Sequence, residues 1–343
     1  MIPLHRKKTY DLLAYEALFR CMHPTHRHHE SIVSVYKKEK AGFDGERNVD
    51  YKLSAYPRDD LFLIKGLRLD NPPFYFQIDT LILTKQFITL LEIKNQQGTF
   101  MYDAKLRQLT QDVNGQVKAY KDPILQVDAQ KMHLQAWLER RGIYGIPIET
   151  LVVVAFPSTV IANVREDPDV YNQIIHTESL HQHLDRIHAK HEKDVFTKRE
   201  MTNLHRQFLR ANQPLRTHIL NTHHVEQHHL IPGIPCSQCA RYPMIRKRGK
   251  WQCPACSATD DDAHKQRILD YFLLHDDTIT NRTCRSLLQI DSPRTAYRLL
   301  NGMNLKHTGT NKGRKYMAPA LGDFPQQSSF PEPPKNHTRN PMR

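Results

Sequence analysis

Two apolar runs in the first half of the chain are separated by a short polar turn. The runs are FYFQIDTLIL at 74–83 and FITLLEIKN at 87–95, with the turn around residues 84–86, and this pattern predicts a β-hairpin. An earlier run, LFLIKGLRL at 61–69, predicts a strand that ends at a turn. A later and nearly continuous run, LVVVAFPS at 151–158, predicts a strand that is covered on both faces.

Apolar residues at helical spacing predict several helices around these strands. The predicted helices cover residues 9–22, 29–40, 42–53 (its start marked by two glycines) and 124–141. Between the strands and the last helix, the dipeptide Asn114-Gly115 predicts a second hairpin. Residues 176–212 read as helical and very polar, with Thr177 as a cap before Leu180.

Three ionisable residues interrupt the apolar hairpin. Side chains alternate between the two faces of a strand, so Glu92 and Lys94 share a face, and Asp79 lies on the preceding strand. Burying charges without partners is costly. A divalent cation held by the carboxylates would resolve this cost and would suit phosphodiester hydrolysis, with the lysine orienting a water molecule. The alternative interpretation is a simple ion pair between Glu92 and Lys94 on an edge strand.

The hairpin resembles the PD-(D/E)xK nuclease core and, more closely, the nuclease-related domain (NERD) family. Members of that family carry a Q-I-D strand, then an E-[IV]-K-N strand and a glycine, which here are Gln77-Ile78-Asp79, Glu92-Ile93-Lys94-Asn95 and Gly98. Upstream, AGFDGERNVDYKL resembles the family's G-x-x-G-E helix start with Gly42, Gly45 and Glu46. Downstream, DPILQVDAQKMHLQAWL resembles its N-P-I-x-Q helix, with Asp122 where the family usually has Asn, then Pro123, Ile124 and Gln126.

The resemblance covers about residues 30–160 and implies an α/β fold with a restriction-endonuclease-like mixed sheet flanked by helices. It also implies that Asp79 and Glu92 bind Mg²⁺ or Mn²⁺, that Lys94 positions or helps to activate the attacking water, and that Glu46 assists as a third carboxylate. Gln126 would contact the substrate backbone. The alternatives are a helix-terminal charge for Glu46 and an ordinary surface position for Gln126.

Two C-x-x-C pairs lie in the last third of the chain. Cys236 and Cys239 are separated by thirteen residues from Cys253 and Cys256, which predicts a zinc ribbon with a closed, structural Zn²⁺ site. The hairpin between the pairs carries charged residues and a tryptophan that could follow nucleic acid. These candidates are Arg246, Lys247, Arg248 and Lys250. The alternative is a ribbon that only joins two domains.

Beyond the ribbon, three short helices followed by a basic hairpin resemble a winged helix-turn-helix module. The third helix, starting at Ser292-Pro293, would enter the major groove and the hairpin would act as the wing. The residues expected to face DNA are Arg294, Tyr297 and Arg298 on the helix, and Lys312, Arg314 and Lys315 on the wing. Winged helices also mediate protein contacts, so protein partners are an open alternative.

Composition and charge narrow the class of protein. The 343 residues carry a net charge of +13, and from residue 236 onward 18 Lys and Arg stand against 9 Asp and Glu, a balance of +9. A basic surface favours a polyanion such as nucleic acid, although a basic tail also aids solubility. No apolar run approaches the length of a membrane span, and no apolar segment follows the first basic residues, so the expected location is the cytoplasm.

The predicted organisation is a nuclease-like domain at 1–160, a helical connector at 161–233, a zinc ribbon at 234–258, a winged-helix-like module at 259–320 and a disordered tail at 321–343. The leading interpretation is metal-dependent hydrolysis of DNA, with the C-terminal modules engaging the nucleic acid. A non-catalytic DNA-binding or scaffolding protein with an inactive nuclease fold is the alternative. RNA as the substrate stays open.

Overall fold

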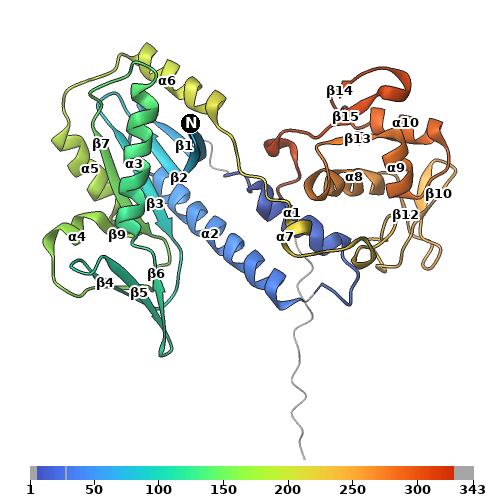
Figure 1. Ribbon diagram of the computed structural model, residues 1–343, viewed down its shortest axis with the longest axis horizontal. Helices are drawn as coiled ribbons and strands as arrows, with labels where there is room; N and C mark the ends of the chain where they lie inside the picture. Colours follow the sequence, from blue (N-terminus) through green and yellow to red (C-terminus); the bar gives the residue numbers. More distant parts are fainter. Residues whose placement is uncertain (1–5, 28, 328–343) are drawn as a thin grey trace, which may run out of the picture. The chain divides into compact units, whose positions relative to one another are not determined.

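The computed structural model describes residues 6–27 and 29–327, which divide into two compact units (Figure 1). The first unit contains Arg6 and residues 38–215. The second contains residues 7–37 and the described residues from 216 onward. Both units are therefore assembled from segments that are far apart in the sequence.

A five-stranded mixed sheet in the order β1-β2-β3-β7-β9 forms the centre of the first unit. Strand β2 is antiparallel to both β1 and β3, whereas β7 runs parallel to both β3 and β9. The hairpin of β2 and β3 confirms the strand prediction for the two central apolar runs. The bounds are β1 (Phe62–Asn71), β2 (Phe74–Leu83), β3 (Ile88–Lys94), β7 (Ile148–Val154) and β9 (Ile174–His176).

A second sheet of the first unit has the order β6-β5-β4-β8. Asn114 and Gly115 connect β5 to β6 with φ angles of 54° and 82°, the left-handed conformation that a tight two-residue hairpin turn requires. This confirms the second predicted hairpin. The bounds are β4 (Thr99–Asp103), β5 (Gln108–Val113), β6 (Gln116–Tyr120) and β8 (Val160–Asn163).

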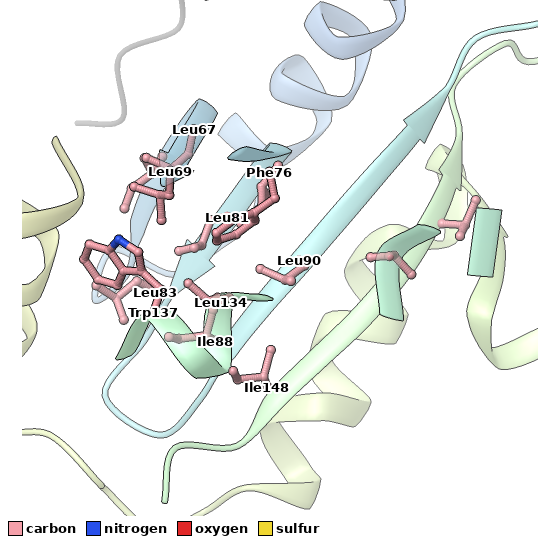
Figure 2. Close-up of a cluster of buried hydrophobic side chains, with 14 of the residues drawn as sticks. Leu67, Leu69, Phe76, Leu81, Leu83, Ile88, Leu90, Leu134, Trp137 and Ile148 are labelled. Carbon is pink, nitrogen blue, oxygen red and sulfur yellow. The ribbon is translucent and has the colours of Figure 1, made fainter. Parts of the chain in front are cut away.

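Helices cover both faces of the central sheet. Side chains of α3 and α6 join one buried cluster with the sheet, and side chains of α2 and α5 join another on the opposite face. Figure 2 shows the first cluster, in which Leu134 and Trp137 of α3 lie against Leu83 and Ile88 of the sheet. The predicted mixed α/β architecture is confirmed. The bounds are α2 (Glu30–Ser54), α3 (Pro123–Glu139), α4 (Pro168–Gln173), α5 (Leu180–Lys190) and α6 (Lys198–Ala211).

Helix α2 differs from the prediction because it is one continuous helix of 25 residues rather than two. The two glycines do not mark a helix start. Gly45 lies in the helix interior, where an added Cβ would come within 2.2 Å of Cβ of Asn95, and Asn95 donates from Nδ2 to the carbonyl of Ala41 at 2.7 Å. The glycine thus permits close contact between α2 and the segment after β3. Glu46 is consequently not a helix-terminal charge, and that alternative is wrong.

Helix α3 begins where the prediction placed it. Its N-cap is Asp122, at the position where the resembled motif usually has Asn. The carboxylate of Asp122 accepts hydrogen bonds from the backbone N–H groups of Ile124 and Leu125 at 2.8 and 3.2 Å, and from the Tyr102 hydroxyl at 2.9 Å. Aspartate caps a helix N-terminus as well as asparagine does. The departure from the resembled motif at this position therefore preserves the cap.

Part of the expected connector belongs to the first unit. Strands β8 and β9 each complete a sheet, and α6 begins with a capping box in which Thr197 and Glu200 bond reciprocally. Thr177 does not cap α5, since its hydroxyl instead donates to the carbonyl of Val154 at 3.1 Å. The division into compact units falls at residue 215 rather than at residue 160.

The second unit contains two small sheets, in the orders β10-β11-β12 and β13-β15-β14, together with short helices. Its helices are α1 (Tyr10–Cys21), α7 (Ile219–Thr222), α8 (Ala263–Leu274), α9 (Asn281–Leu288) and α10 (Pro293–Asn301). Its strands are β10 (Ile245–Lys247), β11 (Lys250–Gln252), β12 (Thr259–Asp260), β13 (Thr278–Thr280), β14 (His307–Thr308) and β15 (Lys315–Met317).

Helix α1 packs on α8, although more than 240 residues separate them. Arg20 pairs with the buried carboxylate of Asp270 at 2.6 Å. Part of the expected disordered tail lies within the described residues. There Phe324 is 2% exposed, and its ring packs edge-on against the Tyr10 ring. The rest of that tail, residues 328–343, lies outside the described residues. In the described part of the chain, no helix is long and apolar enough to cross a membrane.

Candidate active site and metal centre

Glu92 and Lys94 lie at the C-terminal end of β3, on the sheet face that α3 covers. Lys94 Nζ donates to Glu92 Oε1 at 2.7 Å, which confirms that the two side chains share a face. Glu92 is buried, and the side chain of Lys94 is 22% exposed. The ion pair of the simpler interpretation is therefore present, but it lies in the interior beside α3.

Two glutamines of α3 complete the surroundings of Glu92. Gln126 Nε2 donates to Glu92 Oε1 and Gln130 Nε2 donates to Glu92 Oε2, both at 2.8 Å. Gln126 Oε1 also accepts from Lys94 Nζ at 3.0 Å. Gln126 thus contacts the site itself. Gln130 was not predicted, although its spacing of four residues from Gln126 places it on the same helix face.

Asp79 lies where the pairing of β2 with both neighbours is interrupted. The ladder between β2 and β3 ends at Thr80 and Leu91, and the Asp79 carboxylate Oδ2 accepts the N–H of Ile93 at 2.8 Å in place of a backbone partner. On the β1 side, the β1–β2 ladder has a gap at Asp79, because Gly66, which lies opposite it with φ +62°, does not pair with it. The strands therefore separate at Asp79, and its carboxylate comes to the end of β3.

An arginine that the sequence analysis missed joins α2 to this point. Arg6 is 7% exposed. Its guanidinium pairs with Glu46 and with Asp50, one helical turn further along α2, and it also donates to the carbonyl of Asp79 at 2.9 Å and to Thr80 Oγ1 at 2.6 Å. No motif surrounds Arg6, so the sequence held no signal for this position.

Two carboxylates of the site, Asp79 and Glu46, have a raised pKa. Burial raises the pKa of Asp79 well above its usual range, and the negative charges of Glu92 and Glu46 raise it further. Burial also raises the pKa of Glu46, against the opposing effect of Arg6. For Arg6, burial disfavours the charged form, yet the charges of Glu46 and Asp50 raise its pKa overall. The site is thus a desolvated cluster of acids, and the positive charge of Arg6 stabilises it.

The donor set suits a hard divalent cation. Carboxylate oxygens are the ligands that Mg²⁺ and Mn²⁺ prefer, and after burial the negative charges of other carboxylates contribute to the raised pKa of Asp79 and of Glu46. The three carboxylates are nonetheless less tightly gathered than the four thiols of the second unit. Among the described residues, only those thiols form a group of three or more ligand atoms within 4.8 Å of one another.

The four predicted cysteine ligands do come together in the second unit. The Sγ atoms of Cys236 and Cys256 lie 3.7 Å apart, and those of Cys239 and Cys253 lie 3.5 Å apart. Hydrogen bonds from the backbone N–H groups, first that of Cys256, lower the pKa of the Cys253 thiol to about 6. Four converging sulfur atoms could bind a metal such as zinc.

The basic residues proposed for nucleic acid lie on three small elements of the second unit. On the hairpin of β10 and β11, Arg246 is half-buried with its guanidinium 5.1 Å from the centre of the Trp251 ring. The exposed residues of that hairpin are Lys247, Arg248 and Lys250.

On the second element, α10, the predicted residues Arg294, Tyr297 and Arg298 are all exposed. Arg314 lies 5.6 Å from the Tyr297 ring centre, so the hairpin of β14 and β15 contacts α10. Lys315 is exposed. The side chain of Lys312 lies outside the described part of the chain.

Comparison with known proteins identifies part of the first unit. Residues 41–155 match the model of the NERD family, described as a nuclease-related domain. The match runs from α2 through β7 and includes Glu46, Asp79, Glu92 and Lys94. No curated protein and no solved structure matches the chain.

Proposed function

Since residues 41–155 match the model of the NERD nuclease-related domain, we propose that the protein is a metal-dependent nuclease that hydrolyses phosphodiester bonds of DNA. Asp79 and Glu92 would hold Mg²⁺ or Mn²⁺, with Glu46 assisting. Bound there, the ion would polarise the phosphoryl oxygen and lower the pKa of bound water.

One observation carries this proposal. Asp79 and Glu92 belong to different strands, and the chain brings both to the point where β2 and β3 separate, beside Lys94. Folding places like charges in a desolvated space, which raises the pKa of Asp79 and costs stability. Costs of this kind concentrate at functional sites.

The protein's own groups divide the remaining work. Lys94 carries a positive charge beside Glu92 and is partly exposed, so it can orient a water molecule or a phosphate oxygen. Gln126 and Gln130 fix the rotamer of Glu92 from α3 through two hydrogen bonds. Ile93 orients the Asp79 carboxylate through its backbone N–H. These contacts pre-organise the acids before substrate arrives.

The second unit would deliver the substrate. Its last elements run α8, β13, α9, α10, β14, β15 with the sheet order β13-β15-β14, which supports a winged helix-turn-helix assignment. In such a module α10 would enter the major groove of duplex DNA with Arg294 and Arg298, while Lys315 of the wing would contact phosphates. The four thiols would bind a structural Zn²⁺, with no open position for catalysis.

A non-catalytic DNA-binding protein is the second candidate, and one observation favours it. Both oxygens of Glu92 already accept hydrogen bonds, from Lys94, Gln126 and Gln130. A carboxylate satisfied in this way is stable without a metal. The nuclease proposal requires that at least one of these donors yields to the ion.

Plasmid cleavage tests the two candidates. The wild type is incubated with supercoiled and linear duplex DNA in Mg²⁺, Mn²⁺ or EDTA, alongside Asp79→Ala, Glu92→Ala and the exposed control Glu178→Ala, whose carboxylate only pairs with Lys52 at the surface. We expect metal-dependent cutting by the wild type and the control, and none by the two site variants. DNA binding without cutting by the wild type under all conditions would establish the non-catalytic candidate instead.

A further inference from the structure

Arg6 makes the maximum number of hydrogen bonds available to a guanidinium group. Nε and Nη2 donate to the two oxygens of Asp50, each at 3.1 Å, and Nη2 also donates to Thr80 Oγ1. Nη1 donates to Glu46 Oε2 and to the carbonyl of Asp79. All five N–H donors are therefore used, and this fixes the orientation of the group.

The partners of Arg6 come from two elements that form the site. Glu46 and Asp50 belong to α2, four residues apart, whereas Asp79 and Thr80 belong to β2. Near Asp79 the β1–β2 ladder has a gap at Gly66 and the β2–β3 ladder has ended. Arg6 thus supplies a hydrogen bond to a backbone carbonyl where sheet pairing is interrupted.

We propose that Arg6 is a positioning residue for the metal site, an inference that rests on the proposed function. By bonding the Asp79 carbonyl it holds the backbone from which the Asp79 carboxylate projects, and by pairing with Glu46 it directs the third carboxylate toward that point. Its charge also offsets the repulsion among the acids before an ion arrives.

The direction in which metal affinity changes when Arg6 is replaced separates this positioning role from a purely electrostatic one. A guanidinium near the acids repels a divalent cation, so loss of its charge alone would tighten metal binding. Loss of positioning would weaken binding, since the ligands would no longer be pre-organised. Lysine keeps the charge but has only three donors on a point-like ammonium, so it cannot reproduce the five bonds.

The experiment is Mn²⁺ binding by the full chain, followed by electron paramagnetic resonance of the free ion, for the wild type, Arg6→Ala and Arg6→Lys. Circular dichroism and urea unfolding in EDTA establish that each variant is folded. The control is Lys65→Met, which removes another positive charge near the acids, since Lys65 Nζ lies 3.0 Å from Asp50 Oδ2. We expect Arg6→Ala and Arg6→Lys each to weaken Mn²⁺ binding at least about tenfold. We expect Lys65→Met to bind as the wild type does or more tightly.

Unchanged or tighter binding by folded Arg6→Ala, with a wild type that binds Mn²⁺, overturns the positioning role and leaves the proposed function standing. If Arg6→Ala does not fold, Arg6→Lys decides in the same way. A wild type that binds no Mn²⁺ and cuts no DNA in the plasmid assay overturns the proposed function, and the role of Arg6 with it.

Discussion

Asp79 shows how a single carboxylate can reduce the stability of the metal-free protein. Its pKa in the folded chain is raised by burial and by Glu92 and Glu46, so the folded state holds a proton at pH values where the unfolded state has released it. The free energy of unfolding therefore falls as the pH rises from the ordinary aspartate pKa through the raised one. Stability that is present at low pH is lost toward neutrality.

The corresponding prediction concerns Asp79→Asn in EDTA. The variant should be more stable than the wild type at pH 8, because it removes a charge from a cluster of acids, and the difference should shrink as the pH is lowered to 5. Urea unfolding of the wild type and the variant at several pH values measures the stability difference and its dependence on pH. A variant that is less stable than the wild type at pH 8 would show that hydrogen bonding by the charged carboxylate outweighs the repulsion.

The two glycines of α2 give a matched pair of substitutions. An added Cβ at Gly45 would meet Cβ of Asn95 at 2.2 Å, whereas at Gly42 nothing lies within 4 Å. Gly45→Ala should cost about 1–3 kcal/mol of stability because α2 must move from the end of β3. Gly42→Ala should stabilise by up to about 1 kcal/mol through helix propensity. Thermal unfolding of both variants checks the prediction, and equal effects would contradict it.

At the scale of elements, strand β11 and helix α8 meet through a neutral histidine. Trp251 Nε1 donates to His264 Nδ1 at 3.2 Å, and both side chains are buried. Burial lowers the pKa of His264 to about 4, with Arg246 adding repulsion. Protonation of the ring would break the bond and place a charge in the core.

Because the folded pKa of His264 is depressed, its contribution to stability is complete above the unfolded pKa of about 6.5 and is lost as the pH falls toward 4. We expect the second unit to lose roughly 2–4 kcal/mol over this range. Tryptophan fluorescence during urea unfolding at pH 7 and pH 4.5 follows the loss, and His264→Gln should remove most of it. A pH-independent unfolding midpoint would contradict the assignment.

The thiol cluster predicts one bound metal per chain. Elemental analysis of the purified protein should find about one zinc, and Cys253→Ser should lose it, since a structural site of this kind needs its four thiolates. Cys284→Ser is the control, because Cys284 is buried in the core away from the cluster and its loss should leave the zinc content unchanged. Full zinc retention by Cys253→Ser would exclude the site.

Sequence patterns predicted the elements better than the way they join. The strands of the hairpin, the Asn114-Gly115 turn and the start of α3 all depend on local chemistry, and each was confirmed. The single helix α2 was missed because Gly42 and Gly45 look like helix breaks, while the real reason for Gly45 is contact with Asn95. Gln130 could have been found from its spacing, whereas Arg6 reaches its partners across 40 to 74 residues and left no local pattern.

At the scale of the whole molecule, the chain crosses between its two units more than once. Arg6 belongs to the first unit, residues 7–37 to the second, residues 38–215 again to the first, and the remainder to the second. Neither composition nor periodicity records such an exchange, because α1 is a largely buried helix whose partner α8 lies far along the chain. The family match covers residues 41–155, so the second unit had to be interpreted from its own cysteines and basic residues.

The central claim is that Glu92 holds a catalytic metal, and single-turnover cleavage of duplex DNA by Glu92→Gln tests it most directly. Glutamine keeps the shape of the side chain but removes the charge that binds the ion. At saturating DNA and fixed Mn²⁺ we predict that the cleavage rate falls at least about 100-fold, or about 2.7 kcal/mol in the barrier, while DNA affinity stays within about twofold. Cleavage by Glu92→Gln at the wild-type rate would contradict the account and place any nuclease activity elsewhere.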